Sequence, residues 1–355
     1  MKRILVIQQK MIGDVLTSSI ICTNLKKQYP DAVIDYLINS NCYAVVENNP
    51  YIDNFILFKP EYRSSKIAFF KFLKEINKTK YDILIDAYGK LESNLITLFS
   101  TSPTKISYNK WYTHFLYSHP INRLTKSASE IGLAIENRLL LIKGLVRESA
   151  EVEIKPKIFL DHKEVENALQ FLKSNNIDSE KFVVMISVLG SGNKKTYPLT
   201  YMAKVLDEIV NKTDAVLLFN YIPNQEEDAK KVYDLCSDET KKQIKFGVFA
   251  NSLRDFLGVL SLCSGLIGNE GGAINMAKAL NIPTFSIFAS GTSKQGWDLF
   301  KSEKNVSVHL NDFMPELFTA KTKKQIRNRV FELYEQFNPN LFKDLLNEFL
   351  TIIKK

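Results

Sequence analysis

The sequence predicts an α/β protein built from two Rossmann-like, doubly wound parallel-sheet domains. Short apolar segments alternate with amphipathic helical segments along the whole chain, which is the pattern of successive βαβ units. A chain of 355 residues also exceeds the size of one hydrophobic core. At roughly 100–200 residues per domain, this length indicates two domains.

The first half of the chain contains the first series of strands and helices. Its predicted strands are Ile4–Ile7, Val33–Ile38, Phe55–Phe58, Tyr81–Ala87 and Lys105–Tyr108. Its predicted helices begin at Asp14 and end before Pro30, and then cover residues 62–79, 89–100 and 127–145. Helices in such a series cover both faces of a parallel sheet.

The second half repeats the alternation and predicts a second sheet of the same kind. The predicted strands are Phe182–Val188, Ala215–Phe219, Ile244–Phe246, Leu266–Gly268 and Thr284–Phe288. The predicted helices cover residues 199–211, 224–236, 252–263, 272–280, 322–336 and 340–353.

The segment 151–163 separates the two series and is expected to be a linker, because it has no helical apolar stripe and contains Pro156. The first domain then covers residues 1–150 and the second 164–335. Residues 336–355 are expected to form a C-terminal helix that packs toward the first domain. Two such domains would face each other across a cleft, and open α/β sheets bind ligands at the carboxyl ends of their strands.

The composition excludes several classes of protein. Hydrophobic residues at 45% and charged residues at 24% are globular averages, which excludes a disordered or collagen-like chain. No apolar run approaches the ~18–20 residues of a membrane span, and the first residues lack the apolar core of a secretory signal. We therefore expect a cytoplasmic protein without a transmembrane segment. The cysteines are expected to be free, mostly buried thiols, because none forms a CxxC pair: Cys22, Cys42, Cys236 and Cys263.

The net charge of +8 is concentrated in the first half of the chain. Residues 59–80 and residues 101–147 each carry seven basic side chains against two acidic ones. Such an excess favours an anionic partner, which could be a nucleic acid, an acidic membrane surface or a phosphorylated substrate. A solvated, lysine-rich surface without a partner explains the same excess equally well.

Two turns that follow predicted strands are candidates for chemistry. In the turn Gln8–Asp14, Gly13 permits a tight backbone path and Asp14 is expected at the N-cap of the next helix, where it would either cap the helix or react. In the loop Gly190–Pro198, small residues and two lysines resemble a phosphate cradle. The loop fits neither GxxxxGK[ST] nor GxGxxG, so it is not a standard nucleotide motif.

Two further helix starts are candidates for ligand binding. In Gly268–Asn275, glycines open a helix, where free N–H groups and the helix dipole favour an anion. In Pro223–Glu227, an acidic first turn either matches the helix dipole or binds a ribose diol. The sequence has no Asp-x-Asp, HExxH, CxxC or GxSxG motif and no pair of histidines spaced for a metal, so it does not favour metal catalysis or serine hydrolysis.

Taken together, these segments resemble the bacterial heptosyltransferases of glycosyltransferase family 9. The opening ILVIQQKMIGDVLTSSIICTNLKKQYPDAVIDYLI is similar to the start of that family, and GNKKTYP is similar to its Lys-x-aromatic-Pro element. The segment LIGNEGGAINMAKALNIPTFSIFASGTSKQGW resembles its signature Gly-x-Asp-x-Gly-x-x-His-x-Ala-x-Ala-x-x-x-Pro and the tryptophan that follows.

The resemblance implies a GT-B fold, with the acceptor in the first domain and the nucleotide sugar in the second. It implies transfer of a heptose from an ADP-sugar to the inner core of lipopolysaccharide, an anionic glycolipid acceptor at the inner membrane. It makes Asp14 the general base and Lys195 the catalytic contact to the donor phosphates. The other donor-binding residues it implies are Ser191, Glu226 or Glu227, Glu270, Gly271, Gly272 and Ala273. For the acceptor we expect Gly13, Lys105, Lys110, Arg123 and Lys126.

We therefore expect an inverting glycosyltransferase that needs no metal ion or other cofactor. Asp14 would deprotonate the acceptor hydroxyl, while Lys195 and the N–H groups of Gly271–Ala273 would stabilise the departing diphosphate. Some positions depart from the family pattern and leave the sugar and the nucleotide base open. They are Glu270 for Asp, Gly271 for Thr or Ser, Asn275 for His and Tyr197 for Trp.

Other functions remain as alternatives. A nicotinamide oxidoreductase would need a true GxGxxG, which the first turn lacks. A non-catalytic protein that binds nucleotide sugars would have the same folding requirements. A nucleic-acid binder would need aromatic residues among basic ones on an exposed face. We expect instead that the aromatic residues of the basic helix form its core stripe: Tyr62, Phe69, Phe70 and Phe72.

Overall fold

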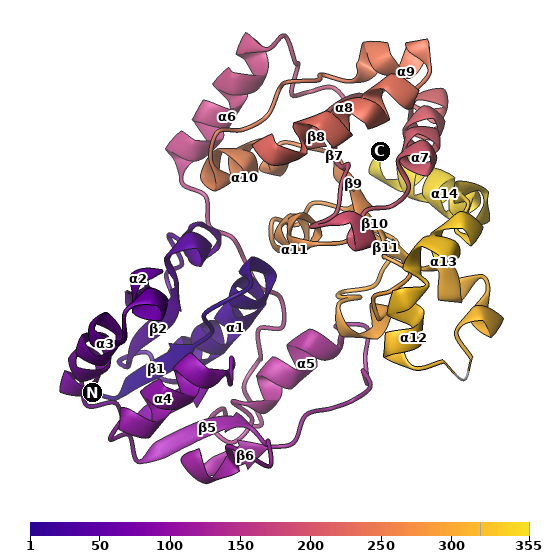
Figure 1. Ribbon diagram of the computed structural model, residues 1–355. Coiled ribbons are helices and arrows are strands. Elements are labelled where there is room, and N and C mark those ends of the chain that lie inside the picture. Colours follow the sequence, from indigo (N-terminus) through magenta and orange to yellow (C-terminus); the bar gives the residue numbers. More distant parts are fainter. Residues whose placement is uncertain (320, 355) are drawn as a thin grey trace. The chain divides into compact units, whose positions relative to one another are not determined.

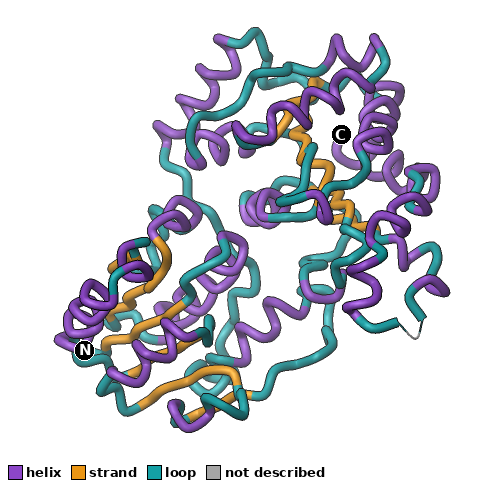
Figure 2. The backbone as a smooth tube through the Cα atoms, viewed as in Figure 1, coloured by secondary structure: helices purple, strands orange, loops and turns teal. Residues whose placement is uncertain are grey.

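The computed structural model describes residues 1–319 and 321–354. The chain divides into two compact units, Met1–Phe159 and Leu160–Lys355. Each unit has one central sheet (Figures 1 and 2). Every strand pair in both sheets is parallel. The prediction of two parallel-sheet α/β domains is confirmed.

The first unit contains a six-stranded sheet in the order β3-β2-β1-β4-β5-β6. This is the strand order of dinucleotide-binding Rossmann domains. The strands are β1 Arg3–Ile7, β2 Val33–Asn39, β3 Asn54–Phe58, β4 Ile83–Asp86, β5 Thr104–Tyr108 and β6 His119–Ile121. The chain leaves β1 toward one side of the sheet and returns at β4 on the other, so the order reverses between these two strands.

The helices of the first unit lie on both faces of its sheet (Figure 1). They are α1 Ile12–Gln28, α2 Glu61–Ser64, α3 Lys66–Lys78, α4 Leu91–Phe99 and α5 Leu133–Leu140. Alternate strand residues face opposite sides of a sheet. Leu5 and Leu37 accordingly belong to the core that includes α3 and α4, whereas the neighbouring Tyr36 donates a hydrogen bond to Val15 O of α1.

The second unit contains a five-stranded sheet in the order β11-β10-β9-β7-β8. Counted within the unit this is the flavodoxin-like order 2-1-3-4-5, which reverses between β7 and β9. The strands are β7 Val183–Ser187, β8 Val216–Asn220, β9 Gly265–Asn269, β10 Thr284–Ile287 and β11 Asn305–Val308.

Two groups of helices enclose the second sheet. The helices are α6 His162–Ser174, α7 Leu199–Lys212, α8 Glu226–Leu235, α9 Asp238–Gln243, α10 Leu253–Ser261, α11 Gly272–Ala279, α12 Lys323–Asn328, α13 Val330–Gln336 and α14 Lys343–Ile353. One face packs into the main core with α7, α8, α13 and α14. On the other side, α6 packs on α10, and α10 contacts α11.

The C-terminal helix α14 packs within the second unit. Its apolar face, formed by Leu346, Phe349 and Leu350, lies in the main core of that unit. Lys343 and Lys354 at its two ends pair with Glu208 and Asp214 of the same unit. The expectation that residues 336–355 pack toward the first domain stays a prediction.

Some predicted elements are shorter or divided. The helix predicted over 127–145 is reduced to α5, because residues 127–129 form a loop that bonds to the buried Glu136 carboxylate. The helix over 62–79 divides at Ser65, whose Oγ caps α3 by accepting from Ala68 N. The helix over 322–336 divides at Arg329. Ile244 forms only an isolated bridge, and β6, β11 and α9 were not predicted.

Two other sequence expectations can be compared with the described residues. The four cysteines are free and buried, as predicted. Among residues 1–319 and 321–354, no helix combines the length and the apolar character that crossing a membrane requires.

Candidate functional site

Each sheet has one place where its strand order reverses, and open α/β sheets bind ligands there, beyond the carboxyl ends of the strands. In the first unit this edge follows β1 and β4, and in the second it follows β7 and β9. The candidate turns Gln8–Asp14, Gly190–Pro198 and Gly268–Asn275 lie directly after β1, β7 and β9. We describe the two edges separately.

Asp14 lies in the first turn of α1, at the edge that follows β1. The helix begins at Ile12 with Met11 as its N-cap, so Asp14 is the third helical residue and the expectation that it is the N-cap is wrong. Its Oδ2 accepts a long hydrogen bond from Met11 N at 3.4 Å. Its Oδ1 accepts from Arg138 Nη2 at 2.8 Å. Gly13, beside it, is buried.

Arg138 of α5 is the partner that fixes the Asp14 carboxylate. Its Nε donates to Ser18 Oγ at 2.8 Å and its Nη1 donates to Ala134 O at 2.7 Å. The Arg138 side chain is 8% exposed, whereas that of Asp14 is 32% exposed. A buried guanidinium with several partners holds one geometry, and it thereby fixes the position of the carboxylate that it binds. No local sequence pattern predicts this pair, because 124 residues separate its members.

A second arginine lies at the same edge. Arg123 Cζ is 3.8 Å from the centroid of the Tyr108 ring, at the carboxyl end of β5. Burial raises the pKa of the Tyr108 phenol, while the charges of Arg138 and Arg123 lower it and that of Asp14 raises it further. These charges therefore act on one buried phenol at this edge of the sheet.

Lys110 belongs to the same region. Its Nζ donates to Gly89 O in the turn after β4, and that turn is held by Asp86 Oδ1, which accepts from Gly89 N at 2.7 Å. Burial lowers the pKa of Lys110, the charges of Lys90 and Arg123 lower it further, and the charge of Asp86 raises it. Lys90 and Arg123 therefore both repel Lys110 beyond β4 and β5, and an anion bound there would reduce this repulsion.

The other predicted acceptor residues lie apart from this group. Lys105 is the second residue of β5, and burial lowers its pKa. It precedes Lys110 by five residues, which is roughly 16 Å along an extended strand, so it lies toward the amino end of the sheet. Lys126 lies in the exposed segment before α5. Of the four predicted cations, the structure thus brings Lys110 and Arg123 together and leaves Lys105 and Lys126 apart from them.

At the edge of the second unit, the loop after β7 folds back on itself. A Cβ on Gly190 would lie 2.2 Å from Lys195 O, so only glycine fits this approach. Thr196 Oγ1 closes the loop by accepting from Gly190 N and donating to Gly192 O, both at 3.1 Å. As a result, Ser191 and Lys195 are held on the outside of the loop with exposed side chains.

Asn269, at the end of β9, ties this loop to its neighbour. Its Oδ1 accepts from Tyr197 N at 2.7 Å, and its Nδ2 donates to Ser187 O and Val188 O at 2.9 and 3.0 Å. The side chain is buried, so these bonds fix the ends of β7 and β9 relative to each other. Sequence analysis did not single out Asn269, although it lies inside the glycine-rich segment.

Glu270 follows directly and is partly buried. Burial raises the pKa of its carboxyl, and the charges of Lys195 and Lys278 lower it. Two ammonium groups therefore act on this carboxylate, and one of them is the predicted phosphate contact. Asn275 turns toward the helix backbone, where its Nδ2 donates to Gly271 O at 3.4 Å.

The start of α11 is free of side chains. A Cβ on Gly271 would meet no atom within 4 Å, and a Cβ on Gly272 would meet only Met276 Cε at 3.9 Å. Neither glycine has the positive φ that would demand glycine. Since neither backbone strain nor crowding requires them, they leave open the end of a helix whose first N–H groups attract anions.

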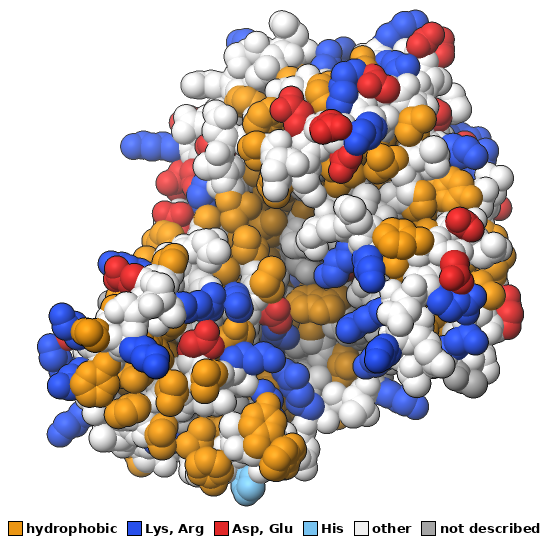
Figure 3. Space-filling model, in the orientation of Figure 1, with side chains coloured by type: hydrophobic (Ala, Val, Ile, Leu, Met, Phe, Trp, Pro, Cys, Tyr) orange, Lys and Arg blue, Asp and Glu red, His pale blue; other side chains and the backbone are white. Residues whose placement is uncertain are grey.

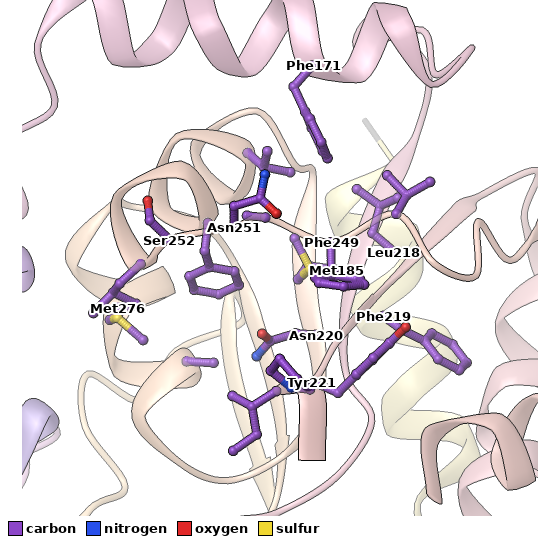
Figure 4. A pocket seen from close by; sticks show the side chains of 18 residues that line it. Phe171, Met185, Leu218, Phe219, Asn220, Tyr221, Phe249, Asn251, Ser252 and Met276 are labelled. Carbon is purple, nitrogen blue, oxygen red and sulfur yellow. The ribbon is translucent and has the colours of Figure 1, made fainter. Parts of the chain in front are cut away.

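A cavity of about 460 Å³ adjoins this helix start. Ala273 and Met276 of α11 contribute to its wall, together with residues of α6, α10, β7, β8 and the segment 248–252 (Figure 4). The wall is mainly apolar, but it includes the polar residues Asn220, Asn251 and Ser252. An apolar cavity with a few polar groups is suited to a flat, partly polar ligand.

The two candidate acidic residues of α8 point to different surroundings. Glu227 pairs with Lys231 at 3.3 Å and its side chain is 89% exposed. Glu226 is also exposed, and its charge raises the pKa of Tyr221, after burial as the main cause. Gln225 Nε2 donates to Gly190 O at 2.9 Å and connects this helix start to the loop after β7.

Within residues 1–319 and 321–354, no group of three or more His, Cys, Asp or Glu side chains is arranged to hold a metal ion. The ligand-binding features of both edges are therefore cations, backbone N–H groups and single carboxylates.

Comparisons with known proteins relate this chain to one family. Residues 69–326 match the family model described as glycosyltransferase family 9 (heptosyltransferase). Lipopolysaccharide heptosyltransferase 1 of Campylobacter coli is 24% identical over 318 residues, which cover 85% of this chain and 88% of the relative.

Solved structures share the fold over nearly the whole chain. A family 9 glycosyl transferase from Veillonella parvula superposes with a TM-score of 0.74 at 18% identity, covering 97% of each chain. An E. coli heptosyltransferase with ADP-2-deoxy-2-fluoro heptose superposes with a TM-score of 0.63 at 14% identity, covering 94% of this chain and 98% of that one.

Proposed function

This chain belongs to glycosyltransferase family 9, and from that premise we propose that it moves a heptose, or a related sugar, from an ADP-sugar to the inner core of lipopolysaccharide or a similar anionic glycolipid. It is a glycosyltransferase with a GT-B fold of two Rossmann-like domains. We further propose that the reaction inverts the anomeric carbon and needs no metal ion. The acceptor would place the enzyme at the cytoplasmic surface of the inner membrane.

The donor site belongs to the second unit. The observation that carries the proposal is the bare start of α11 beside the cavity, because it offers N–H groups for a diphosphate next to space for a base. The base would enter the cavity near Tyr221, and Glu226 would bind the ribose. Lys195 would contact the diphosphate, with Ser191 on the same loop. Glu270 would bind sugar hydroxyls beside Lys195, whose charge already acts on it.

The reaction starts at Asp14 in the first unit. Its carboxylate accepts the proton of the acceptor hydroxyl as that oxygen bonds to the anomeric carbon. The bond between the anomeric carbon and the diphosphate oxygen breaks, and its electron pair leaves with ADP. The new negative charge is stabilised by Lys195 and by the N–H groups of Gly271–Ala273. Arg138 holds the Asp14 carboxylate in one orientation for the proton transfer.

The acceptor would be held by its negative charge. Lys110 and Arg123 lie at the sheet edge that Asp14 also borders, and the described residues form no ion pair that includes either of them, although the charge of Asp86 acts on Lys110. A phosphate or carboxylate group of the glycolipid would supply the missing charge. Lys90 adds a third cation that the sequence analysis did not predict as a ligand.

A related donor remains a second candidate, and the departures around α11 favour it. Gly271 leaves more room than the usual Thr or Ser, and Asn275 is turned toward Gly271 O and away from the ligand side. A thermal-shift panel of ADP-, UDP- and GDP-sugars tests this point. The largest shift with ADP-heptose supports the first candidate, and a larger shift with another nucleotide sugar supports the second.

Lys195→Ala tests the donor site directly. We expect ADP to bind at least about tenfold more weakly, which is about 1.4 kcal/mol, while adenosine is unaffected because it lacks phosphate. Lys194→Ala is the matched control, since it removes the neighbouring exposed ammonium. Calorimetry that finds equal losses for ADP and adenosine, or equal losses in both variants, would remove Lys195 from the phosphate site.

A further inference from the structure

Helix α4 exposes three of its apolar residues and buries two of its polar ones, while its Ile96 lies in the core of the first unit. Ser93 and Thr97 are fully buried in the first unit, whereas Leu91 is 71% exposed, Leu98 55% and Phe99 45%. A surface helix normally shows the opposite pattern, because burial of apolar side chains drives its packing. The outer face of α4 is therefore the kind of surface that a partner covers.

Neighbouring elements extend this apolar surface. The Phe70 ring of α3 lies 6.4 Å from the Phe99 ring, and Ile67, one turn earlier on α3, is 72% exposed. Phe70 is thus at the surface, and the expectation that it belongs to the core stripe is wrong. Phe72 of that stripe is buried, and Tyr62 and Phe69 pack against the same core.

The loop after β5 adds the most exposed aromatic side chains. Trp111 is 86% exposed and Phe115 is 73% exposed. The loop is tied to α4 by Tyr117 Oη, which donates to Asn94 Oδ1 at 2.9 Å. We call the combined surface the apolar ridge, formed by Ile67, Phe70, Leu91, Leu98, Phe99, Trp111 and Phe115. Hydrophobic side chains gather over this part of the first unit in Figure 3.

Lysines surround the ridge on the same elements. They are Lys66, Lys71, Lys74 and Lys78 of α3 and Lys90 before α4. Lys74 Nζ lies 4.8 Å from the centroid of the Phe70 ring, so cation and apolar side chain share one surface. Two acidic residues nearby are already paired, Glu75 with Lys78 and Glu92 with Arg63. The charge left over is positive.

The second unit shows no comparable group in the part of the chain that the structure describes. Its large exposed apolar side chains lie on separate elements: Leu169, Ile222, Leu235, Phe331 and Leu345. Single exposed apolar residues are normal on a soluble protein. The concentration of such residues among lysines is therefore a property of the first unit.

We propose that the apolar ridge and its lysines dock onto an anionic phospholipid bilayer. Leucine and aromatic side chains enter the boundary between headgroups and acyl chains, and lysines remain at the level of the phosphates. Each lysine near an anionic surface adds to the attraction, which salt reduces. A second copy of this chain fits less well, because a two-fold contact would bring the lysines of both copies together.

The position of the apolar ridge is also relevant to the transfer reaction, and this point rests on the proposed function. Leu91 and Trp111 follow the carboxyl ends of β4 and β5, which is the sheet edge where Asp14 follows β1. A glycolipid anchored in the bilayer would therefore offer its sugar at that edge. Docking shortens the search for the acceptor, because the hydroxyl and Asp14 are then held at one surface.

Sedimentation of the full chain with vesicles tests the docking itself. We expect binding to vesicles of phosphatidylcholine with about 30% phosphatidylglycerol, weaker binding to phosphatidylcholine alone, and release by salt. Leu98→Ser with Phe99→Ser should weaken binding at least about tenfold, and Lys71→Glu with Lys74→Glu should do so similarly. Phe331→Ser with Leu345→Ser, at exposed apolar positions of the second unit, is the matched control and should bind like the wild type.

Three results would overturn this proposal. They are absence of vesicle binding by the wild type, equal loss in the control variant, and a dimer that dissociates in the Leu98→Ser, Phe99→Ser variant without any vesicle binding. The last result would assign the ridge to a second copy. Vesicle binding needs neither donor nor acceptor, so it fails or succeeds independently of the proposed transfer reaction.

Activity then separates docking from catalysis. The ridge variant should retain turnover on a soluble, lipid-free acceptor and lose most of it when the acceptor is embedded in vesicles. Equal activity on both acceptors in the ridge variant would contradict a role for docking in catalysis. If the wild type transfers no sugar to either acceptor, the proposed function fails and the docking result stands alone.

Discussion

The two sheet edges prepare for a ligand in opposite ways. At the first, the carboxylate of Asp14 is already bound by Arg138, whose own side chain is buried and bonded to Ser18 and Ala134. At the second, the start of α11 is bare, and added Cβ atoms at Gly271 and Gly272 would meet almost nothing. One edge fixes a side chain, and the other keeps a space open.

This difference matches the two tasks of a transfer reaction. A group that accepts a proton must be oriented before the substrate arrives, since reorganisation during the reaction would raise the barrier. A site that binds a diphosphate needs accessible N–H groups, and any side chain over them would compete with the ligand. The comparison predicts that substitutions at the first edge change the rate, whereas those at the second change the affinity for the donor.

The largest expected effect comes from Asp14→Asn. Turnover should fall by about 10²–10⁴-fold, because an amide cannot accept the acceptor's proton. Donor affinity should stay the same. The variant should also lose about 1 kcal/mol of stability, because Arg138 keeps a hydrogen-bond acceptor but loses its counter-charge. Transfer rate, donor affinity and melting temperature should be measured on one preparation.

Ser18→Ala is the control for that stability loss. It removes the hydroxyl that accepts from Arg138 Nε but leaves the Asp14 carboxylate in place. It should lower the melting temperature similarly and keep most of the activity. If Ser18→Ala slows turnover as much as Asp14→Asn does, the rate follows the stability of the network and Asp14 is not the base.

Gly272→Val should produce the second-largest effect, and at the other edge. We expect ADP to bind at least about 100-fold more weakly, because the new side chain fills the space over the first N–H groups of α11. The fold should be intact, since a Cβ there meets only Met276 Cε at 3.9 Å. Gly144→Val in the first unit is the matched control, because a Cβ on Gly144 would meet nothing within 4 Å. Unchanged ADP affinity by calorimetry would place the diphosphate elsewhere.

A smaller effect is expected from the cations near Asp14. Reversing Lys110 and Arg123 to Glu should raise the acceptor KM several-fold and leave donor affinity unchanged. Added salt should also raise the acceptor KM, because at ~0.15 M salt the interaction between exposed charges is largely screened beyond about 8 Å. Lys105→Glu is the control, since Lys105 lies toward the amino end of β5. An equal rise in KM for Lys105→Glu would show that only the overall charge of the unit matters.

The smallest expected effect is on stability, through Glu270→Gln. Burial raises the pKa of this carboxyl above its ordinary value of 4.5, so the folded chain holds the proton more tightly than the unfolded chain. As the pH rises from about 4 through the raised pKa of Glu270, the carboxyl of the wild type ionises in its buried site. This ionisation destabilises the folded wild type, whereas the glutamine of the variant stays neutral. Without donor, the variant should therefore melt at a higher temperature than the wild type at pH 7 and at the same temperature near pH 4. A lower melting temperature for the variant at pH 7 would contradict this.

The positions of strands and turns were largely predictable from the sequence. The turns around Asp14, Gly190 and Gly271 are set by short-range signals, namely an apolar strand, small residues and a helical pattern in succession. The prediction of two parallel sheets followed from the same alternation and is confirmed. The positions of strands and turns depend on residues that are close in the sequence, so short segments of the sequence are enough to predict them.

The contacts that decide the chemistry depended on tertiary structure. The partner of Asp14 is 124 residues away, and Asn269 joins two loops more than 70 residues apart. Sequence spacing also could not separate Glu226 from Glu227, because adjacent residues of a helix face different surroundings. Nor could it show that α4 exposes its leucines, because an apolar stripe has the same period whether it faces the core or the solvent. Only the packing of the sheet against one face of each helix decides which side chains remain for a ligand or a partner.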